Sequence, residues 1–196
     1  MSSVGDVAGA GADGADQNER PAVKKQRKFT EADLGGPIED EETARKKLRD
    51  AGFDPDKVTQ IRIVKKPEGM GNQWYVNPIC HFAGAGDLKM CRYLLTRGAS
   101  MTTTDEATFE GSIIKCPMSA AAVFGRKDVC EWLFHHGAHS DINRERSNPL
   151  RLSLEPTKPP GQNMKTFTDA CTDTVKWLLF NGGIPSDAEG LSLIHI

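Results

Sequence analysis

The chain has 196 residues, enough for one ordinary domain or a short array of repeats. Its 25 Lys and Arg residues nearly balance 27 Asp and Glu residues, and the formal net charge is -2. This balance argues against a dedicated nucleic-acid binder, because such proteins normally carry a basic face and a pI above about 9. The chain has no apolar run of about 18 residues, so neither a transmembrane helix nor membrane binding is expected.

The N-terminal residues do not resemble a secretory signal or an organelle transit peptide. No apolar stretch follows a basic start, and the many acidic residues are atypical of an organelle transit peptide. The five cysteines contain no CxxC pair, which excludes the usual spacings of a disulfide framework or a zinc ribbon. We therefore expect reduced thiols and a cytoplasmic location, with the nucleus as the alternative.

Residues 1–28 are rich in Gly, Ala and Asp and contain no aromatic residue. Such a segment buries too little apolar surface to offset its ordering entropy, so we predict a disordered tail. The tail ends in a basic cluster formed by Lys24, Lys25, Arg27 and Lys28. This cluster is a candidate nuclear-import signal, and the alternative is a solvated basic tail.

Residues 29–67 are expected to form an N-terminal cap or a degenerate half repeat. Thr30 and Asp33 fit a capping box. A helix is predicted over 39–51, because its acidic residues come first and its basic residues come last, as the helix dipole favours. Gly52 is expected to end this helix.

The segment 68–190 contains an internal repeat. Each copy starts with a proline, continues through small residues to an apolar helix and ends at a glycine. The prolines are Pro78, Pro117 and Pro149, and the terminal glycines are Gly98, Gly137 and Gly182. From Pro78 to Pro117 is 39 residues, as is Gly98 to Gly137. The period indicates stacked helix pairs, because one pair cannot bury its apolar face alone.

At these residues the chain resembles the ankyrin repeat family, whose signature is T-P-L-H, small residues with Gly, then V-V-x-x-L-L-x-x-G-A. The segments NPICHFAGAGDLKMCRYLLTRGAS and CPMSAAAVFGRKDVCEWLFHHGAH match over a whole helix pair each. The third copy matches only at its ends, because SLEPTKPPGQNMKTFTDACTD interrupts it where the turn between helices is expected. The resemblance implies an all-α, ankyrin-like helical-repeat solenoid of about three repeats.

The chain departs from that signature in two ways. The signature Thr is replaced by Asn77, Cys116 and Asn148, so its hydrogen bonds must be remade or lost. The 39-residue spacing exceeds the usual pitch of about 33 residues, which lengthens the finger at 101–115. Long fingers are where such a solenoid is expected to gain specificity.

Two recurring positions within the copies are interpreted as structural. Tyr93, Trp132 and Trp177 occupy the same slot in successive units, and we predict that they form a packing ladder rather than a binding stripe. Cys91 and Cys130 also share a slot and are interpreted as small buried hydrophobic residues.

No catalytic signature is present, so the chain is predicted not to be an enzyme and to need no cofactor. His135, His136 and His139 lie close to Cys130, but zinc sites usually take four ligands in paired spacings. We attribute the presence of these histidines at the helix C-terminus to the favourable interaction of cationic side chains with the helix dipole. We therefore predict no metal site. Nucleic-acid binding through Lys65-Lys66 and nearby aromatic residues is not expected, because the surrounding charge is too low.

The resemblance implies a non-catalytic module, expected as a monomer, that recognises an unidentified partner protein through its fingers and concave face. Aromatic and arginine residues dominate interface energetics. The candidate partner-binding residues, each with a structural role as its alternative, are Trp74, Tyr75, His81, Phe109, Val123, Phe124, Arg144 and Arg146. Phe109→Ala is expected to weaken binding without lowering the melting temperature.

Two other classes remain open. One is a regulatory arm of a larger enzyme whose catalytic part lies beyond residue 190, and the other is a nuclear regulator that uses the cluster at 24–28. The last six residues, LSLIHI, correspond to the translated end of a sequencing-library adaptor. Residues 191–196 are therefore expected to be a non-native tail, the alternative being a genuine apolar tail.

Overall fold

The structure is a computed structural model, and it describes residues 29–59, 62–64, 74–102, 116–144, 148–154 and 161–184. The predicted disordered tail at 1–28, the predicted non-native tail at 191–196 and most of the long finger lie outside these ranges. The described part is mainly helical, as predicted.

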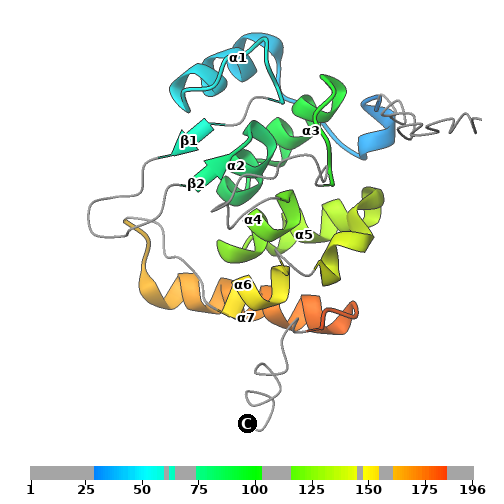
Figure 1. Cartoon of the computed structure of the whole chain (residues 1–196), viewed down its shortest axis with the longest axis vertical. Coiled ribbons are helices and arrows are strands. Elements are labelled where there is room, and N and C mark those ends of the chain that lie inside the picture. Colours follow the sequence, from blue (N-terminus) through cyan, green and yellow to red (C-terminus); the bar gives the residue numbers. More distant parts are fainter. Residues whose placement is uncertain are drawn as a thin grey trace, which may run out of the picture.

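Three helix pairs are stacked along the molecule (Figure 1). They are α2 (Pro78–Ala85) with α3 (Leu88–Thr96), α4 (Pro117–Val123) with α5 (Lys127–Leu133), and α6 (Pro149–Leu154) with α7 (Met164–Phe180). Helix α4 packs against both α2 and α6, so it is the middle of three neighbouring first helices. The short helices η2 (Phe134–Ala138) and η3 (His139–Asn143) follow α5.

The N-terminal region adds η1 (Ala32–Leu34) and α1 (Glu41–Asp50) to the stack. Thr30 and Asp33 form the predicted capping box, since the main-chain N–H of Thr30 donates to Asp33 Oδ2 at 2.9 Å. The main-chain N–H of Asp33 donates back to Thr30 Oγ1 at 3.4 Å. Gly52 has φ 76°, in the left-handed region, and follows the end of α1 as predicted.

A two-stranded antiparallel sheet departs from the all-α prediction. Strand β1 (Arg62–Val64) pairs with β2 (Trp74–Val76), and Ile63 lies opposite Tyr75. These short runs are rich in β-branched and aromatic residues, which favour strands. Strand β2 leads through Asn77 directly into α2.

The three first helices begin at the predicted prolines, and an asparagine caps two of them and a cysteine the third. Asn77 Oδ1 accepts a hydrogen bond of 2.9 Å from the main-chain N–H three residues later. Asn148 Oδ1 does the same at 3.0 Å, and Cys116 Sγ at 3.3 Å. Helix capping is therefore remade at these positions with different acceptors.

The aromatic residues at the recurring position, Tyr93, Trp132 and Trp177, contact elements that precede them in the chain. Tyr93 is buried and its hydroxyl donates to Glu41 on α1 at 3.0 Å. Trp132 is also buried, whereas Trp177 is half-buried, with its ring edge-on to Phe134 at 5.6 Å between centroids. These positions are packing residues, as predicted.

The small recurring residues are also buried as predicted. Cys91 and Cys130 lie fully inside the main core. Ala83, Ala121 and Ala122 have no exposed surface, which allows neighbouring first helices to approach closely.

Helix α7 differs from the prediction for the third unit. It starts at Met164, inside the segment that was interpreted as an interruption, and runs for 17 residues. Asn163 caps it, since its Oδ1 accepts from the main-chain N–H groups of the second and third helical residues. Phe167, Cys171 and Leu178 are buried with helical spacing along its length. The interruption therefore ends at about Gln162, and the rest belongs to the second helix.

Candidate binding pocket beside helix α7

The eight predicted partner-binding residues do not form one cluster among the described residues. Phe109, Arg146 and the basic cluster at Lys24, Lys25, Arg27 and Lys28 lie outside the described ranges. Trp74 and Tyr75 lie on β2. His81 is exposed on α2, and its ring lies edge-on to the rings of Phe53 and Phe82, at centroid distances of 5.5 and 5.0 Å.

Val123 is a core residue, which corrects its prediction as a groove residue. Its side chain is only 3% exposed and packs with Cys80 and Ala120. The reason is the position of α4 between α2 and α6, which leaves every residue of α4 buried. Val123 is therefore not available to a partner.

Arg144 is half-buried and pairs with a buried carboxylate on η3. Its Nη1 lies 3.2 Å from Oδ1 of Asp141, which is 2% exposed. This contact gives Arg144 a structural role, which was the alternative to partner binding.

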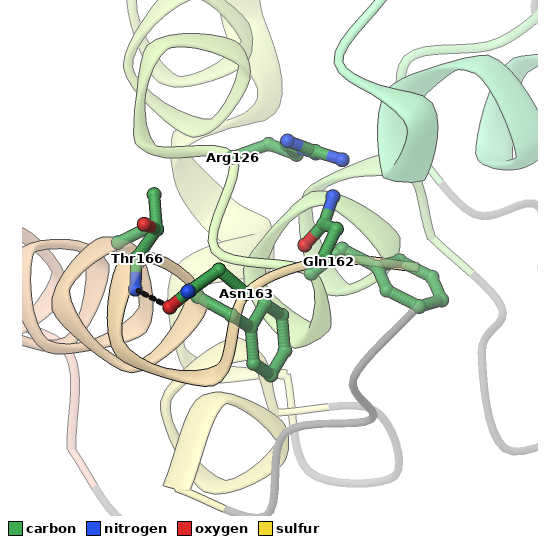
Figure 2. A pocket seen from close by; sticks show the side chains of 7 residues that line it. Arg126, Gln162, Asn163 and Thr166 are labelled. Atoms are coloured by element: carbon green, nitrogen blue, oxygen red, sulfur yellow. Dashed lines mark hydrogen bonds between the residues drawn. The ribbon is translucent and has the colours of Figure 1, made fainter. Parts of the chain in front are cut away.

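Among the predicted residues that the structure describes, Phe124 lines a cavity. The cavity has a volume of about 270 Å³ and lies between the α4–α5 turn and the N-terminal half of α7 (Figure 2). Its walls are formed by Phe124, Arg126, Gln162, Asn163, Thr166, Phe167 and Ala170. Four of these residues belong to α7 or its cap, so the cavity depends on the early start of that helix.

Two glycines allow the close packing that shapes this pocket. A Cβ atom on Gly84 would lie 2.8 Å from the Phe124 ring, so the absence of a side chain lets the ring lie against α2. Gly125 has φ +65°, and a Cβ atom there would lie 2.9 Å from the main-chain nitrogen of Cys171. The α4–α5 turn is therefore held directly against the backbone of α7.

Among the described residues of the pocket wall, Arg126 is the only charged one. Its Nε donates a hydrogen bond of 3.1 Å to the carbonyl oxygen of Gly84, which links the α4–α5 turn to α2. Figure 2 shows the guanidinium on one rim of the pocket, on the same side as the Gln162 side chain. Within the described part of the chain, no carboxylate forms an ion pair with Arg126.

The local sequence contains some signals for this pocket. Asn163 precedes a helical apolar period, which is typical of a helix N-terminus. The contact between Arg126 and Gly84 joins residues 42 positions apart, and local pattern analysis could not have found it.

All five cysteine thiols are buried. Desolvation raises the pKa of each, and it raises the pKa of Cys116 to about 11. These thiols are therefore protonated at neutral pH and lack the thiolate character of reactive cysteines.

The histidines near the end of α5 pack around aromatic rings. His136 Nδ1 lies 2.7 Å from the carbonyl oxygen of Trp132, and the rings of His135 and His139 are both edge-on to Phe134. Among the residues that the structure describes, no group of three or more His, Cys, Asp or Glu side chains is arranged to hold a metal. None of the helices in the described ranges is long and apolar enough to span a membrane.

Comparison with known proteins gives no match: no family model, no curated protein and no solved structure is significantly similar to the chain. Function is therefore inferred from the residues and geometry of this chain itself.

Proposed function

We propose that this chain is a non-catalytic protein–protein interaction module, built as an ankyrin-like stack of helix pairs. It recognises a partner protein through the half-buried apolar surface formed by Phe124 and Leu152 and through the pocket beside α7. The repeated sequence motif and the neighbouring positions of α2, α4 and α6 support this proposal. The fingers of the repeats, which lie mostly outside the described residues, are a further part of the proposed recognition.

The observation that carries the proposal is the position of Phe124 in two apolar environments at once. It packs against a small cluster of first-helix residues, Cys80, Ala120 and Val123, which is separate from the main core. The half-buried Leu152 of α6 packs against the same cluster. Phe124 also forms part of the pocket wall, so a half-buried apolar surface leads into a cavity that contains an arginine.

Such a combination is typical of protein interfaces. Interface energy is concentrated in buried aromatic and arginine anchors, surrounded by residues that exclude water. The buried, protonated thiols support binding rather than covalent catalysis, because a nucleophilic cysteine needs an accessible thiolate.

The proposal is tested by isolating a partner with the tagged full chain and then measuring the affinity of the purified pair by calorimetry. Phe124→Ala and Leu152→Ser are expected to weaken the affinity by about tenfold or more each. Thr172→Ala is the control, because Thr172 is exposed on α7 and does not line the pocket.

Circular dichroism at the temperature of the binding assay shows whether each variant is folded. The proposal is wrong if no protein binds the folded wild-type chain saturably. It is also wrong if folded Phe124→Ala and Leu152→Ser bind the partner as tightly as the control.

A further inference from the structure

We infer that the pocket beside α7 receives the carboxylate side chain of an aspartate or glutamate on the partner protein. This inference rests on the proposed function and specifies which chemistry the pocket recognises. It is based on the charge of the pocket wall, its donors, its size and its rigidity.

The charge of the wall is the first argument. Of the seven lining residues, Arg126 alone is charged, and the described residues place no acidic side chain in the wall. Its Nε is used by the Gly84 carbonyl, which leaves the two terminal amino groups as donors for a ligand. A guanidinium offers a planar pair of donors, and this geometry matches a carboxylate.

Other features of the wall favour the same ligand. Thr166 and Asn163 both line the pocket, and the Oδ1 of Asn163 caps α7. The pocket also lies at the N-terminus of a 17-residue helix, whose dipole favours a negative charge.

Size and composition limit the ligand to a single acidic side chain. A cavity of about 270 Å³ with Phe124, Phe167 and Ala170 in its wall can surround the methylene groups of that side chain. Phosphate recognition commonly uses clusters of arginines, whereas the described residues of this wall include one cation. The geometry therefore favours a carboxylate over a phosphorylated residue.

The arginine is held in position before any ligand arrives. A Cβ atom on Gly86 would lie 3.2 Å from Cδ of Arg126, so the arginine stem packs closely over the end of α2. Together with the hydrogen bond to the Gly84 carbonyl, this contact restricts the side chain. Restriction in the free protein lowers the entropy lost on binding.

The test is a titration of the isotopically labelled full chain, followed by NMR of its main-chain amides. The probe is the α-amide of N-acetylglutamate, and the matched neutral probe is the α-amide of N-acetylglutamine. At constant ionic strength, the glutamate probe is expected to give saturable shifts at residues 124–126 and 162–170. The glutamine probe is expected to bind at least about tenfold more weakly, because it lacks the charge.

Two pocket variants and one control accompany the titration. Arg126→Gln keeps a donor for the Gly84 carbonyl but removes the charge. Thr166→Glu introduces a carboxylate at the third position of α7, where glutamate is favourable, so the variant is expected to fold. The new carboxylate is expected to pair with the Arg126 guanidinium in place of the ligand. Both variants should lose the probe-induced shifts. Thr168→Glu makes the same charge change at an exposed residue outside the wall and should retain them.

The outcomes separate this inference from the proposed function. Equal binding of both probes, tighter binding of inorganic phosphate, or unchanged glutamate binding by folded Thr166→Glu would overturn the carboxylate assignment. If a partner binds saturably and Thr166→Glu leaves its affinity unchanged, the inference fails while the proposed function stands. If the probe binds as expected but no partner protein exists, the proposed function fails and the carboxylate site stands alone.

Discussion

The indole Nε1 of Trp132 donates a hydrogen bond of 2.9 Å to the main-chain carbonyl of Leu34, 98 residues earlier in the chain. Arg92 also holds the N-terminal segment close to Trp132. Its guanidinium lies over the Trp132 ring, and its Nη1 donates to the carbonyl of Pro37 at 3.3 Å. Leu34 itself is fully buried. The N-terminal segment is therefore fixed across α3 and α5 by specific polar contacts as well as by apolar packing.

Trp132→Phe is expected to reduce the free energy of unfolding by about 2 kcal/mol, because it leaves the buried Leu34 carbonyl without its donor. Trp177→Phe is the control, since the structure shows a ring contact for Trp177 but no indole hydrogen bond among the described residues. It should cost less than about 1 kcal/mol. Urea unfolding followed by circular dichroism measures both values. Equal losses in the two variants would contradict a specific role for the Trp132 hydrogen bond.

Gly125→Ala is expected to destabilise the protein by more than about 2 kcal/mol. It combines a left-handed backbone with a Cβ atom only 2.9 Å from the main chain of α7. Gly98→Ala is the matched control, because Gly98 has φ +94° but a Cβ atom there would meet no atom within 4 Å. The control isolates the backbone strain, which costs about 1–2 kcal/mol. Thermal unfolding measures the loss of stability in both variants. If Gly125→Ala loses no more stability than Gly98→Ala, the α4–α5 turn is not packed tightly against the backbone of α7.

Local sequence signals predicted the helix starts well. A polar residue before the helix accepts a hydrogen bond from the first turn, and proline at the first helical position has no N–H that needs a partner. Pro78, Pro117 and Pro149 therefore begin helices although their caps differ chemically. The recurring aromatic slot was predicted correctly for the same reason, since its spacing relative to each helix is constant.

Features that depend on neighbours distant in sequence were missed. Val123 looked like a groove residue from its position on a first helix, but the close approach of α2 and α6 buries all of α4. The start of α7 was missed because a proline-rich stretch precedes it and was taken as a longer interruption. Arg126 was not a candidate, since its role depends on Gly84 and on the early start of α7.

Asp141 is expected to give the protein an acid-dependent gain in stability. Burial raises the pKa of this carboxyl above its ordinary value of 3.8, and Arg144 only partly opposes the shift. Because the folded protein then binds the proton more tightly than the unfolded chain, the ionised side chain costs stability at neutral pH. This cost is removed as the pH falls toward 3.8. The stability advantage of Asp141→Asn over the wild type should therefore shrink on acidification.

Asp40 provides the control of opposite sign. Its hydrogen bond with the main-chain N–H of Thr43 lowers the pKa of its carboxyl below 3.8. Its ionised form stabilises the fold, and this contribution is lost as the pH falls through the lowered pKa. Urea unfolding from pH 7 down to pH 3 should show the wild type losing stability relative to Asp40→Asn. Slopes of the same sign for the two variants would contradict the burial of the Asp141 charge.

Asp87 is expected to be more important for stability than Glu39, although both pair with Lys47. Lys47 Nζ lies 2.5 Å from Glu39 Oε2 and 2.7 Å from Asp87 Oδ2, but the pair is partly exposed. Asp87 also caps α3, since its Oδ1 accepts from the main-chain N–H of Met90 at 3.1 Å. Asp87→Ala should therefore cost about 1–2 kcal/mol, whereas Glu39→Ala should cost about 0.5 kcal/mol or less.

Salt separates the two contributions of Asp87. The ion pairs with Lys47 are weakened at 1 M NaCl, where the Debye length is about 3 Å, although their partial burial limits the screening. The helix cap is less affected, so urea unfolding at low and high salt should show the Glu39→Ala loss shrinking by a larger fraction than the Asp87→Ala loss. If both losses disappear at high salt, Asp87 acts through charge alone and does not stabilise α3 as its cap.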